Sequence, residues 1–526
     1  MATNKTNPQG KTAAEKLIDL VTSECELIHD QKKKPFAITC KGSVRQVFGL
    51  HSNTFKEYIA NLYYRKHKLA LSDLALKAAL SALTGKAIYD GKQHAVHHRI
   101  AKTGQSYWLD LCNADWEVVE ISASGWAIRS GSCVPLFERS ASGKALPNPI
   151  GGGTLGALWD VANIPKNDQL LVVAWLLECL RSDTPYVLLE LIGEQGSAKS
   201  TTQQILKMLI DPNEANLRSA PKNVEDIWVG ASNSHLVSFE NISYLPKNFQ
   251  DALCVLATGG ANVTRTLYTN KEESIIQRCN PTVINGISAN VTAPDLLDRC
   301  LHIELPRVQK RLLSKDVDSQ FAMQQPYLLG ALLDQFVKAL QILPTVTVAD
   351  SDRPRMLDFA YLGEAVFQSQ GFAAGEFLSR YKAMREQGVY RTIEASPIGA
   401  ALFTYLDKHP SGWRGRAAQL LGLLEIYRQK GEKNWPLSGK AMGDALRRLS
   451  PALGTFGFDC RSNPKTGGAY IWQIDPIQID LPKPSPASPA SPESPAEELE
   501  GLGHAGHAGH EFGDFDYEQM EGPLPF

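Results

Sequence analysis

Residues 186–210 read YVLLELIGEQGSAKSTTQQILKMLI, and this stretch decides the fold. An apolar run ends at Gly193, a loop with a second glycine at Gly196 follows, and Lys-Ser-Thr (199–201) opens an amphipathic helix. A buried strand, a glycine loop and a helix in this order form the context of a phosphate-binding loop. We therefore expect an α/β fold built around a site for nucleotide phosphates.

Each part of this loop has a predicted role. Backbone N–H groups of the loop and of the helix N-terminus would surround the phosphates of ATP. The Lys199 ammonium would reach the β- and γ-phosphate oxygens, and the Ser200 hydroxyl would bind Mg²⁺. The residues predicted to hold the nucleotide are Gly193, Gly196, Ser197, Ala198, Lys199, Ser200 and Thr201.

Ala198 departs from the pattern G-x-x-x-x-G-K-[ST], which has glycine before the lysine. Alanine fits there if its φ is negative, because only a positive φ demands glycine. The alternative for the whole stretch is a chance glycine-rich turn between a strand and a helix.

A second strand-like run, HLVSFENIS (235–243), ends in Glu240 and Asn241. In phosphate-loop ATPases a strand beside the loop strand ends in an acid that holds Mg²⁺, often followed by a second acid that activates water. Glu240 fits the metal role. Asn241 cannot act as a base and could only orient water. The alternative is an edge strand that ends in an exposed glutamate.

The segment LATGGANVTRTLYTNKEES (256–274) carries Arg265, Tyr268 and Lys271 after a Gly-Gly turn. Basic side chains with an aromatic between them suit a phosphate backbone and a stacked base. These three residues are candidate DNA contacts, and a solvated loop is the alternative.

Two further strands carry candidate residues near their ends. Asn285 closes the run PTVING (281–286), where contact with the γ-phosphate or the attacking water is geometrically natural. Arg299 precedes the run LHIELP (301–306). It either forms an ion pair within the chain or reaches a neighbouring subunit's nucleotide as an arginine finger.

Residues 391–475 form a separate unit of three helical stretches followed by a two-stranded ribbon, which looks like a winged helix. Basic side chains on the last helix and on the ribbon suit contact with a DNA backbone. They are Lys440, Arg447, Arg448, Arg461 and Lys465. The alternative is a protein-interaction module or a plain helical domain.

Residues 476–526 change character to a Pro/Ser/Ala/Glu-rich tail that cannot form a core. Its acidic-aromatic end resembles the C-terminal tip of bacterial single-stranded-DNA-binding proteins, which docks into basic, apolar pockets on replication enzymes. The resemblance implies host replication proteins as partners, and the alternative is an acidic tail for solubility. The residues concerned are Asp514, Phe515, Asp516, Pro525 and Phe526.

Composition limits the class of protein. The 526 residues are 43% hydrophobic and 21% charged, which is ordinary for a globular chain. The formal net charge is −2, but the tail holds ten acids and one base, so the rest of the chain carries +7 and charge does not oppose DNA binding. Apolar runs fall short of the ~18–20 residues of a membrane span, and scattered cysteines fit a reducing cytoplasm. We expect a cytoplasmic protein.

Periodicity predicts helices over 12–28, 52–68 and 72–84, then strands joined by tight turns up to about residue 130. His94, His97 and His98 are expected to be exposed on a strand, with His97 and His98 on opposite faces. The predicted organisation is 1–150 as an N-terminal α+β domain of unknown task, 157–310 as the ATPase core, 311–390 as a helical lid or linker, 391–475 as the winged helix and 476–526 as a disordered acidic tail.

Residues 186–306 together resemble the ATPase core of AAA+ proteins, and more narrowly superfamily 3 helicases and helicase–primase ATPases of phages and plasmids. The matching blocks are GEQGSAKST (193–201), FEN (239–241), TGGANVTRTLY (258–268) and LLDRC (296–300), with Asn285 as sensor 1. Such families form ring-shaped hexamers that use ATP and Mg²⁺ to translocate along DNA. The resemblance implies these properties for this chain, while Ala198 and Asn241 depart from the family pattern.

The function predicted from these features is that of an ATP-dependent DNA helicase or replication protein of a bacterial phage or mobile element. One alternative is a non-motor ATPase that acts as a replication initiator or helicase loader. The other is an ATP-gated defence or regulatory switch.

Overall fold

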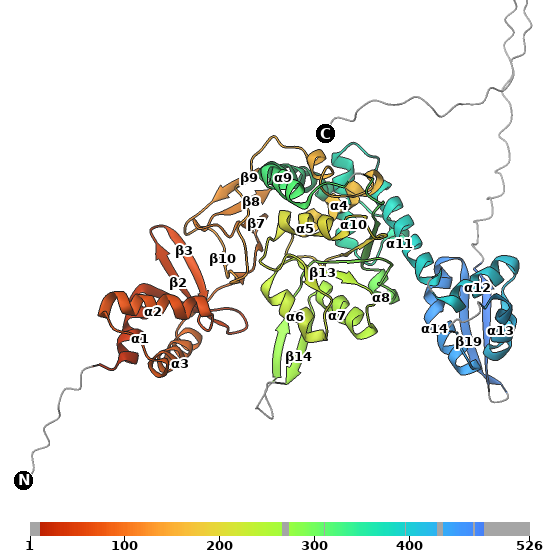
Figure 1. Ribbon diagram of the computed structural model, residues 1–526, viewed down its shortest axis with the longest axis horizontal. Coiled ribbons are helices and arrows are strands. Elements are labelled where there is room, and N and C mark those ends of the chain that lie inside the picture. The colour runs from red at the N-terminus through yellow and green to blue at the C-terminus, as the bar shows by residue number, and fades with distance from the viewer. Residues whose placement is uncertain are drawn as a thin grey trace, which may run out of the picture.

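The computed structural model describes residues 11–265, 273–309, 311–394, 396–428, 435–466 and 469–477. Figure 1 shows an N-terminal mixed unit, a central sheet flanked by helices, and a C-terminal helical unit with its own small sheet. The predicted mixed α/β architecture with a parallel sheet is confirmed.

The N-terminal unit has a four-stranded sheet in the order β3-β2-β1-β4, packed on helices. The predicted helix over 12–28 is four residues too long, because β1 pairs with β2 from Cys25 onward and this pairing outweighs the helical periodicity. The elements are α1 (Ala13–Glu24), β1 (Cys25–His29), β2 (Pro35–Lys41), β3 (Val44–Gly49), α2 (Asn53–His67), α3 (Asp73–Tyr89) and β4 (Lys92–Gln93).

A second antiparallel sheet, β6-β7-β8-β9, follows the predicted run of short strands. Its side chains share one core with the central unit, since Leu109 and Val119 lie in the same buried cluster as Phe336. This core therefore crosses the boundary predicted near residue 150. The strands are β5 (Val96–His97), β6 (Ile100–Thr103), β7 (Ser106–Asp110), β8 (Val118–Ser122), β9 (Gly125–Arg129) and β10 (Leu136–Phe137).

The central sheet has five parallel strands in the order β12-β13-β16-β11-β17. The strands predicted at 186–192, 235–240, 281–287 and 301–306 are all present. The strands are β11 (Leu188–Ile192), β13 (Val237–Ile242), β16 (Thr282–Gly286), β17 (Cys300–Glu304) and one that was not predicted, β12 (Arg218–Ser219). The hairpin of β14 (Ala261–Arg265) and β15 (Glu273–Gln277) lies outside this sheet.

Helices cover both faces of this sheet, so its strands are mostly buried on both faces and do not alternate between apolar and polar residues. Leu189 of β11 packs into the larger core with α5 and α9, and Leu188 packs into the second core with α6 and α7. Figure 1 shows α5 and α9 on one side of the sheet and α6 and α7 on the other. The helices are α4 (Gln169–Glu178), α5 (Lys199–Ile210), α6 (Val224–Asn233), α7 (Lys247–Thr258), α8 (Pro294–Leu297), α9 (Ser314–Ile342), α10 (Leu357–Ser369) and α11 (Glu376–Glu394).

The C-terminal unit has its own core, which contains Leu402, Leu420, Leu446 and Trp472. The three predicted helices and the ribbon are present, and a short strand, β18, adds a third member to the sheet β18-β20-β19. The elements are α12 (Pro397–Lys408), β18 (Trp413–Arg416), α13 (Ala417–Leu424), α14 (Gly439–Thr455), β19 (Phe458–Thr466) and β20 (Ala469–Pro476). None of the helices in the described part of the chain combines the length and apolarity that a membrane span requires.

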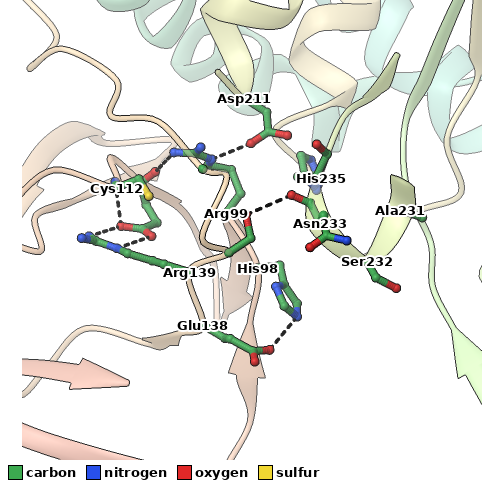
Figure 2. A pocket seen from close by; sticks show the side chains of 14 residues that line it. His98, Arg99, Cys112, Glu138, Arg139, Asp211, Ala231, Ser232, Asn233 and His235 are labelled. Carbon is green, nitrogen blue, oxygen red and sulfur yellow. Dashed lines mark hydrogen bonds and ion pairs between the residues drawn. The ribbon is translucent and has the colours of Figure 1, made fainter. Parts of the chain in front are cut away.

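A buried ionic cluster of Arg99, Lys207 and Asp211 connects the β6–β9 sheet to α5 of the central unit. Lys207 of α5, which is 0% exposed, donates to the Asp211 carboxylate at 3.1 Å and to the carbonyl of Leu236 at 2.7 Å. Arg99 donates to the other Asp211 oxygen at 2.8 Å, as Figure 2 shows. Burial alone would raise the pKa of Asp211, but the charges of Lys207 and Arg99 outweigh it and lower that pKa. The carboxylate thus stays ionised between two cations.

Replacing Lys207 by methionine should lower the free energy of unfolding by about 3–5 kcal/mol, because the chain length is kept while a buried ion pair loses one partner. Chemical denaturation followed by tryptophan fluorescence measures this. Lys338→Met, at an exposed position of α9, is the matched control and should change the free energy of unfolding little. Equal stability of the two variants would contradict a structural role for the cluster.

Candidate functional site

The predicted phosphate loop lies between the carboxyl end of β11 and the first turn of α5. Gly193 and Gly196 are both required by the geometry. A Cβ at Gly193 would lie 2.6 Å from Ser197 Oγ and 2.7 Å from the carbonyl oxygen of Leu305, and Gly196 has φ +90°. The loop closes on itself through the Ser197 hydroxyl, which donates to the carbonyl of Glu194 at 2.9 Å.

Ala198 has φ +56° and ψ 30°, so the condition under which alanine would fit without strain is not met. Ala198 is the N-cap residue through which the chain enters α5. An L-residue in that region costs roughly 1–2 kcal/mol. Strain of this kind persists where the surrounding structure holds it, and such positions cluster at ligand sites.

The ammonium group of Lys199 lies inside the loop. It donates to the carbonyls of Gly193 at 2.7 Å and Glu194 at 2.8 Å, and contacts Ser197 Oγ at 3.4 Å. Burial lowers the pKa of Lys199. The three acceptors are neutral, so a phosphate oxygen would be a stronger partner for this cation.

Two residues that the sequence did not single out hold the loop from outside. Asn163 donates through Nδ2 to the carbonyls of Ser197 at 3.0 Å and Pro306 at 2.7 Å, and its backbone N–H donates to Thr202 Oγ1 at 3.0 Å. Arg311 lies over the loop, because a Cβ at Gly196 would be 2.9 Å from its Nη2. Nothing in the local sequence marks Asn163, while Arg311 belongs to the basic run that follows β17.

Glu240 and Asn285 lie at the same edge of the sheet as the loop. Asn285 pairs in register with Leu191 near the end of β11, and Glu240 lies between the register pairs Phe239–Ile284 and Ile242–Gly286. We expected the acidic strand directly beside β11, but β16 lies between them. Buried parallel strands have similar sequences, so their lateral order is not readable from composition.

The Asn285 amide is part of a buried polar network. Its Oδ1 accepts from the backbone N–H of Asn241 at 2.9 Å, and its Nδ2 donates to Gln203 Oε1 at 2.6 Å. Gln203, which is fully buried on α5, donates in turn to Ser238 Oγ at 2.8 Å. The network thus links α5 to the strands β13 and β16. The sequence signal that could have identified Gln203 is a glutamine on the buried face of an amphipathic helix.

Asn241 is exposed and has φ +55° at an irregularity in the pairing of β13 with β16. The bulge turns it out of the ladder. Glu240 is half-buried beside it. The two residues therefore stay at the strand end, where the prediction placed them.

Arg299 forms the ion pair that was one of its two predicted arrangements. Its side chain is 10% exposed and its Nη1 donates to the carbonyl of Asp295 at 2.7 Å and pairs with that residue's carboxylate. The guanidinium is thus held within the chain by α8. Its reach to a neighbouring subunit stays a prediction.

The predicted DNA-facing segment is only partly described. Arg265 ends β14, where it pairs in register with Glu273. Tyr268 and Lys271 lie outside the described residues. The hairpin projects from the central unit in Figure 1.

In the C-terminal unit, Lys440, Arg447 and Arg448 are exposed on α14. Arg447 pairs with Asp444, one turn before it on the same helix. On the ribbon, Arg461 pairs with Asp459 at 3.2 Å and Asp475 at 2.9 Å. Lys440 and Arg448 have no such acidic partner within the described residues.

Lys465 belongs to β19, and its side chain is not among those described. The five tail residues predicted to bind a partner, Asp514, Phe515, Asp516, Pro525 and Phe526, lie outside the described residues.

Comparison with known proteins identifies two family models. Residues 155–387 match the actinomycete integrative conjugative element replication protein, and residues 398–488 match the C-terminal domain of the same kind of protein. Together they span more than half of the chain. No curated protein matches the sequence.

Solved structures similar to the chain include two of the NrS-1 C-terminal region without ligand. The A form has a TM-score of 0.38 at 12% identity, covering 88% of this chain and 99% of that one. The second has a TM-score of 0.37 at 12% identity, covering 89% and 100%. TM-scores this low do not establish a common fold.

Substituting Ala198 by glycine should raise the free energy of unfolding by about 0.5–1 kcal/mol, because relief of the left-handed strain exceeds the entropy that glycine adds to the unfolded chain. Chemical denaturation without nucleotide measures this. Ala322→Gly, at an exposed helical position of α9, is the control and should lower stability by roughly 0.5–1 kcal/mol. A loss of stability in both variants would contradict the strained loop.

Proposed function

The chain belongs to the family of actinomycete integrative conjugative element replication proteins, and on this premise we propose that it is an ATP-dependent DNA helicase that replicates the element. The observation that carries the proposal is the meeting of three groups at one edge of a parallel sheet. These are the glycine loop with Lys199, the carboxylate of Glu240 and the amide of Asn285. Ligands of such sheets bind at the carboxyl ends of the strands.

The residues present fit ATP and Mg²⁺. The glycines allow the tight loop that presents backbone N–H groups to a phosphate, since a Cβ at Gly193 would clash with Ser197 and Leu305 and Gly196 has φ +90°. Lys199 would exchange its carbonyl partners for β- and γ-phosphate oxygens, and Ser200 and Glu240 would hold Mg²⁺. The metal, when bound, neutralises the charge that develops on the transferred phosphoryl group.

Side chains of the protein would make the other contacts to the nucleotide phosphates. The Asn285 amide, fixed by Gln203 and by the Asn241 backbone, would lie beside the γ-phosphate. A change in the hydrogen-bond partners of Asn285 would alter its contacts with both α5 and β13. Arg311, over the loop, adds a cation near the phosphates. We propose for this core an AAA+-like phosphate-loop ATPase, acting as a hexameric ring in which Arg299 reaches the neighbouring nucleotide.

The C-terminal unit would bind DNA as a winged helix. Three helices and a three-stranded sheet support this, with α14 presenting Lys440 and Arg448 to solvent. Arg447 and Arg461 already have acidic partners, so their net contribution to a phosphate backbone would be smaller. The acidic tail would recruit host replication proteins.

A second candidate function is a non-motor ATPase that loads a helicase or acts at the origin. Asn241 favours it, because an asparagine occupies the position where an acid would activate water. Slow turnover would suit a loader more than a motor. DNA-stimulated ATPase activity without strand displacement would identify this function.

Lys199→Ala should abolish strand displacement by the full-length protein and lower ATP affinity, since the loop would lose its only predicted contact between an ammonium group and the phosphates. A forked-duplex unwinding assay with ATP and Mg²⁺ measures the first, and equilibrium binding of a fluorescent ATP analogue the second. Lys222→Ala, at an exposed position before α6, is the matched control. Equal unwinding by wild type and Lys199→Ala would refute the helicase.

Glu240→Gln should separate binding from hydrolysis. We expect ATP affinity within a few-fold of wild type and a rate of phosphate release lower by roughly 10²-fold, because the metal loses a charged ligand that matters most in the transition state. Steady-state phosphate release is compared with Glu225→Gln, an exposed glutamate on α6. Hydrolysis at the wild-type rate would remove Glu240 from the site.

A further inference from the structure

A cavity of about 560 Å³ lies between the N-terminal unit and the base of the β14–β15 hairpin. The turn between β1 and β2 forms one wall, β5 and the residues after β10 form the next, and the end of β15 closes it. Its charged lining residues are Asp30, Lys32, Lys34, Glu138 and Arg278, and His97 and His98 also line it. Figure 2 shows His98 and Glu138, which this cavity shares with its smaller neighbour.

Both acids of this cavity already have partners. The Asp30 carboxylate accepts from the backbone N–H groups of Lys32 and Lys34, each at 2.8 Å, and so shapes the turn. Glu138 accepts from the Lys34 ammonium at 2.7 Å and contacts His98 Nε2 at 3.2 Å. Burial alone would raise the pKa of Glu138, but the hydrogen bond to His98 and the charge of Lys34 outweigh it and lower that pKa to about 2.

The two histidines add little charge near neutral pH. We expected them to be exposed, but both are half-buried, because the turn between β1 and β2 and the residues after β10 cover them. Burial lowers the pKa of His97 and of His98 below the ordinary value of 6.5. The positive charge of the cavity therefore comes from its two lysines and its arginine, and Asp30 and Glu138 supply two negative charges.

Lys32 and Arg278 are the cations without an acidic partner among the described residues. The Lys32 ammonium donates only to the backbone carbonyl of Gln277, at 3.4 Å. Burial and then the charge of Arg278 lower the pKa of Lys32, and the charge of Asp30 acts to raise it. Burial also lowers the pKa of Arg278, although the nearby charges of Glu138 and Asp30 act to raise it. Two cations that line one cavity and form no salt bridge among the described residues make a site for an anion.

The position of the cavity indicates which anion. Arg278 directly follows β15, and the register of the hairpin runs from Ala261–Gln277 at the cavity to Arg265–Glu273 at its far end. Four residue steps at about 3.3 Å span roughly 13 Å. That length matches about four phosphates of one strand at ~3.4 Å each. A volume in the range of ~300–1,000 Å³ also suits a nucleotide-sized group.

We propose that this cavity binds a phosphate group of the single-stranded DNA that passes along the β14–β15 hairpin, with Lys32 and Arg278 as its two cations. The inference rests on the proposed function, since it requires a DNA strand at the hairpin. The sequence left the task of the N-terminal unit open. The inference gives this unit a role, which is to form one wall of the DNA path.

The test measures binding of a fluorescent 20-mer of deoxythymidylate to the full-length protein by anisotropy across a salt series. Lys32→Ala and Arg278→Gln should each weaken binding about fivefold at 0.1 M salt and reduce the slope of log K against log salt by about 0.7, the value for one contact to a single strand. The double variant should lose about 25-fold and about 1.4 in slope. Lys77→Ala, exposed on α3 in the same unit, is the charge-matched control and should behave as wild type.

Three results would overturn the inference. Variants that bind DNA with the wild-type affinity and slope would remove the cavity from the DNA path while leaving the proposed function intact. Weaker binding of ATP with unchanged binding of DNA would assign the cavity to a free nucleotide. A wild-type protein that does not bind the 20-mer would end both the inference and the proposed function.

Discussion

The burial of the central parallel sheet on both faces is the constraint on which the rest of the structure depends. Leu188 and Leu189 point into different cores, so β11 is fixed in register and in face. Because the neighbouring strands run parallel to it, their carboxyl ends meet at one edge. The glycine loop, Glu240 and Asn285 are neighbours for this reason, although long stretches of sequence separate them.

The polar network behind the loop follows from the same constraint. A buried amide must be hydrogen-bonded, and Gln203 and Asn285 satisfy each other and the bulged backbone at Asn241. The strained φ of Ala198 is tolerated beside this network and the contacts of Asn163. Strain at the loop and rigidity behind it together fix the entry to α5, so that the helix N-terminus faces the place predicted for the phosphates.

Much of the fold could be predicted from the sequence, and the reasons for the failures differ. The strand–loop–helix unit at 186–210 was readable because local residue types dictate it. The end of α1 was not, since pairing of Cys25 with Thr39 is a long-range contact. The φ of Ala198 depends on the whole turn and not on its side chain. Of the candidate site, Lys199 was predicted from the glycine loop and Glu240 and Asn285 from strand ends, whereas Asn163 makes its contacts through the fold and no local pattern marks it.

The basic residues show why the salt bridges must be known before a DNA-binding surface is inferred from the sequence. Counting basic residues in the C-terminal unit favours Arg447 and Arg461, yet both have carboxylates beside them. Lys32 and Arg278 drew no attention in the sequence, because single cations in a turn and after a strand are ordinary. The fold brings them together and leaves them without an acidic partner among the described residues. A phosphate gains more from these two cations than from Arg447 and Arg461, since no existing salt bridge must first be broken.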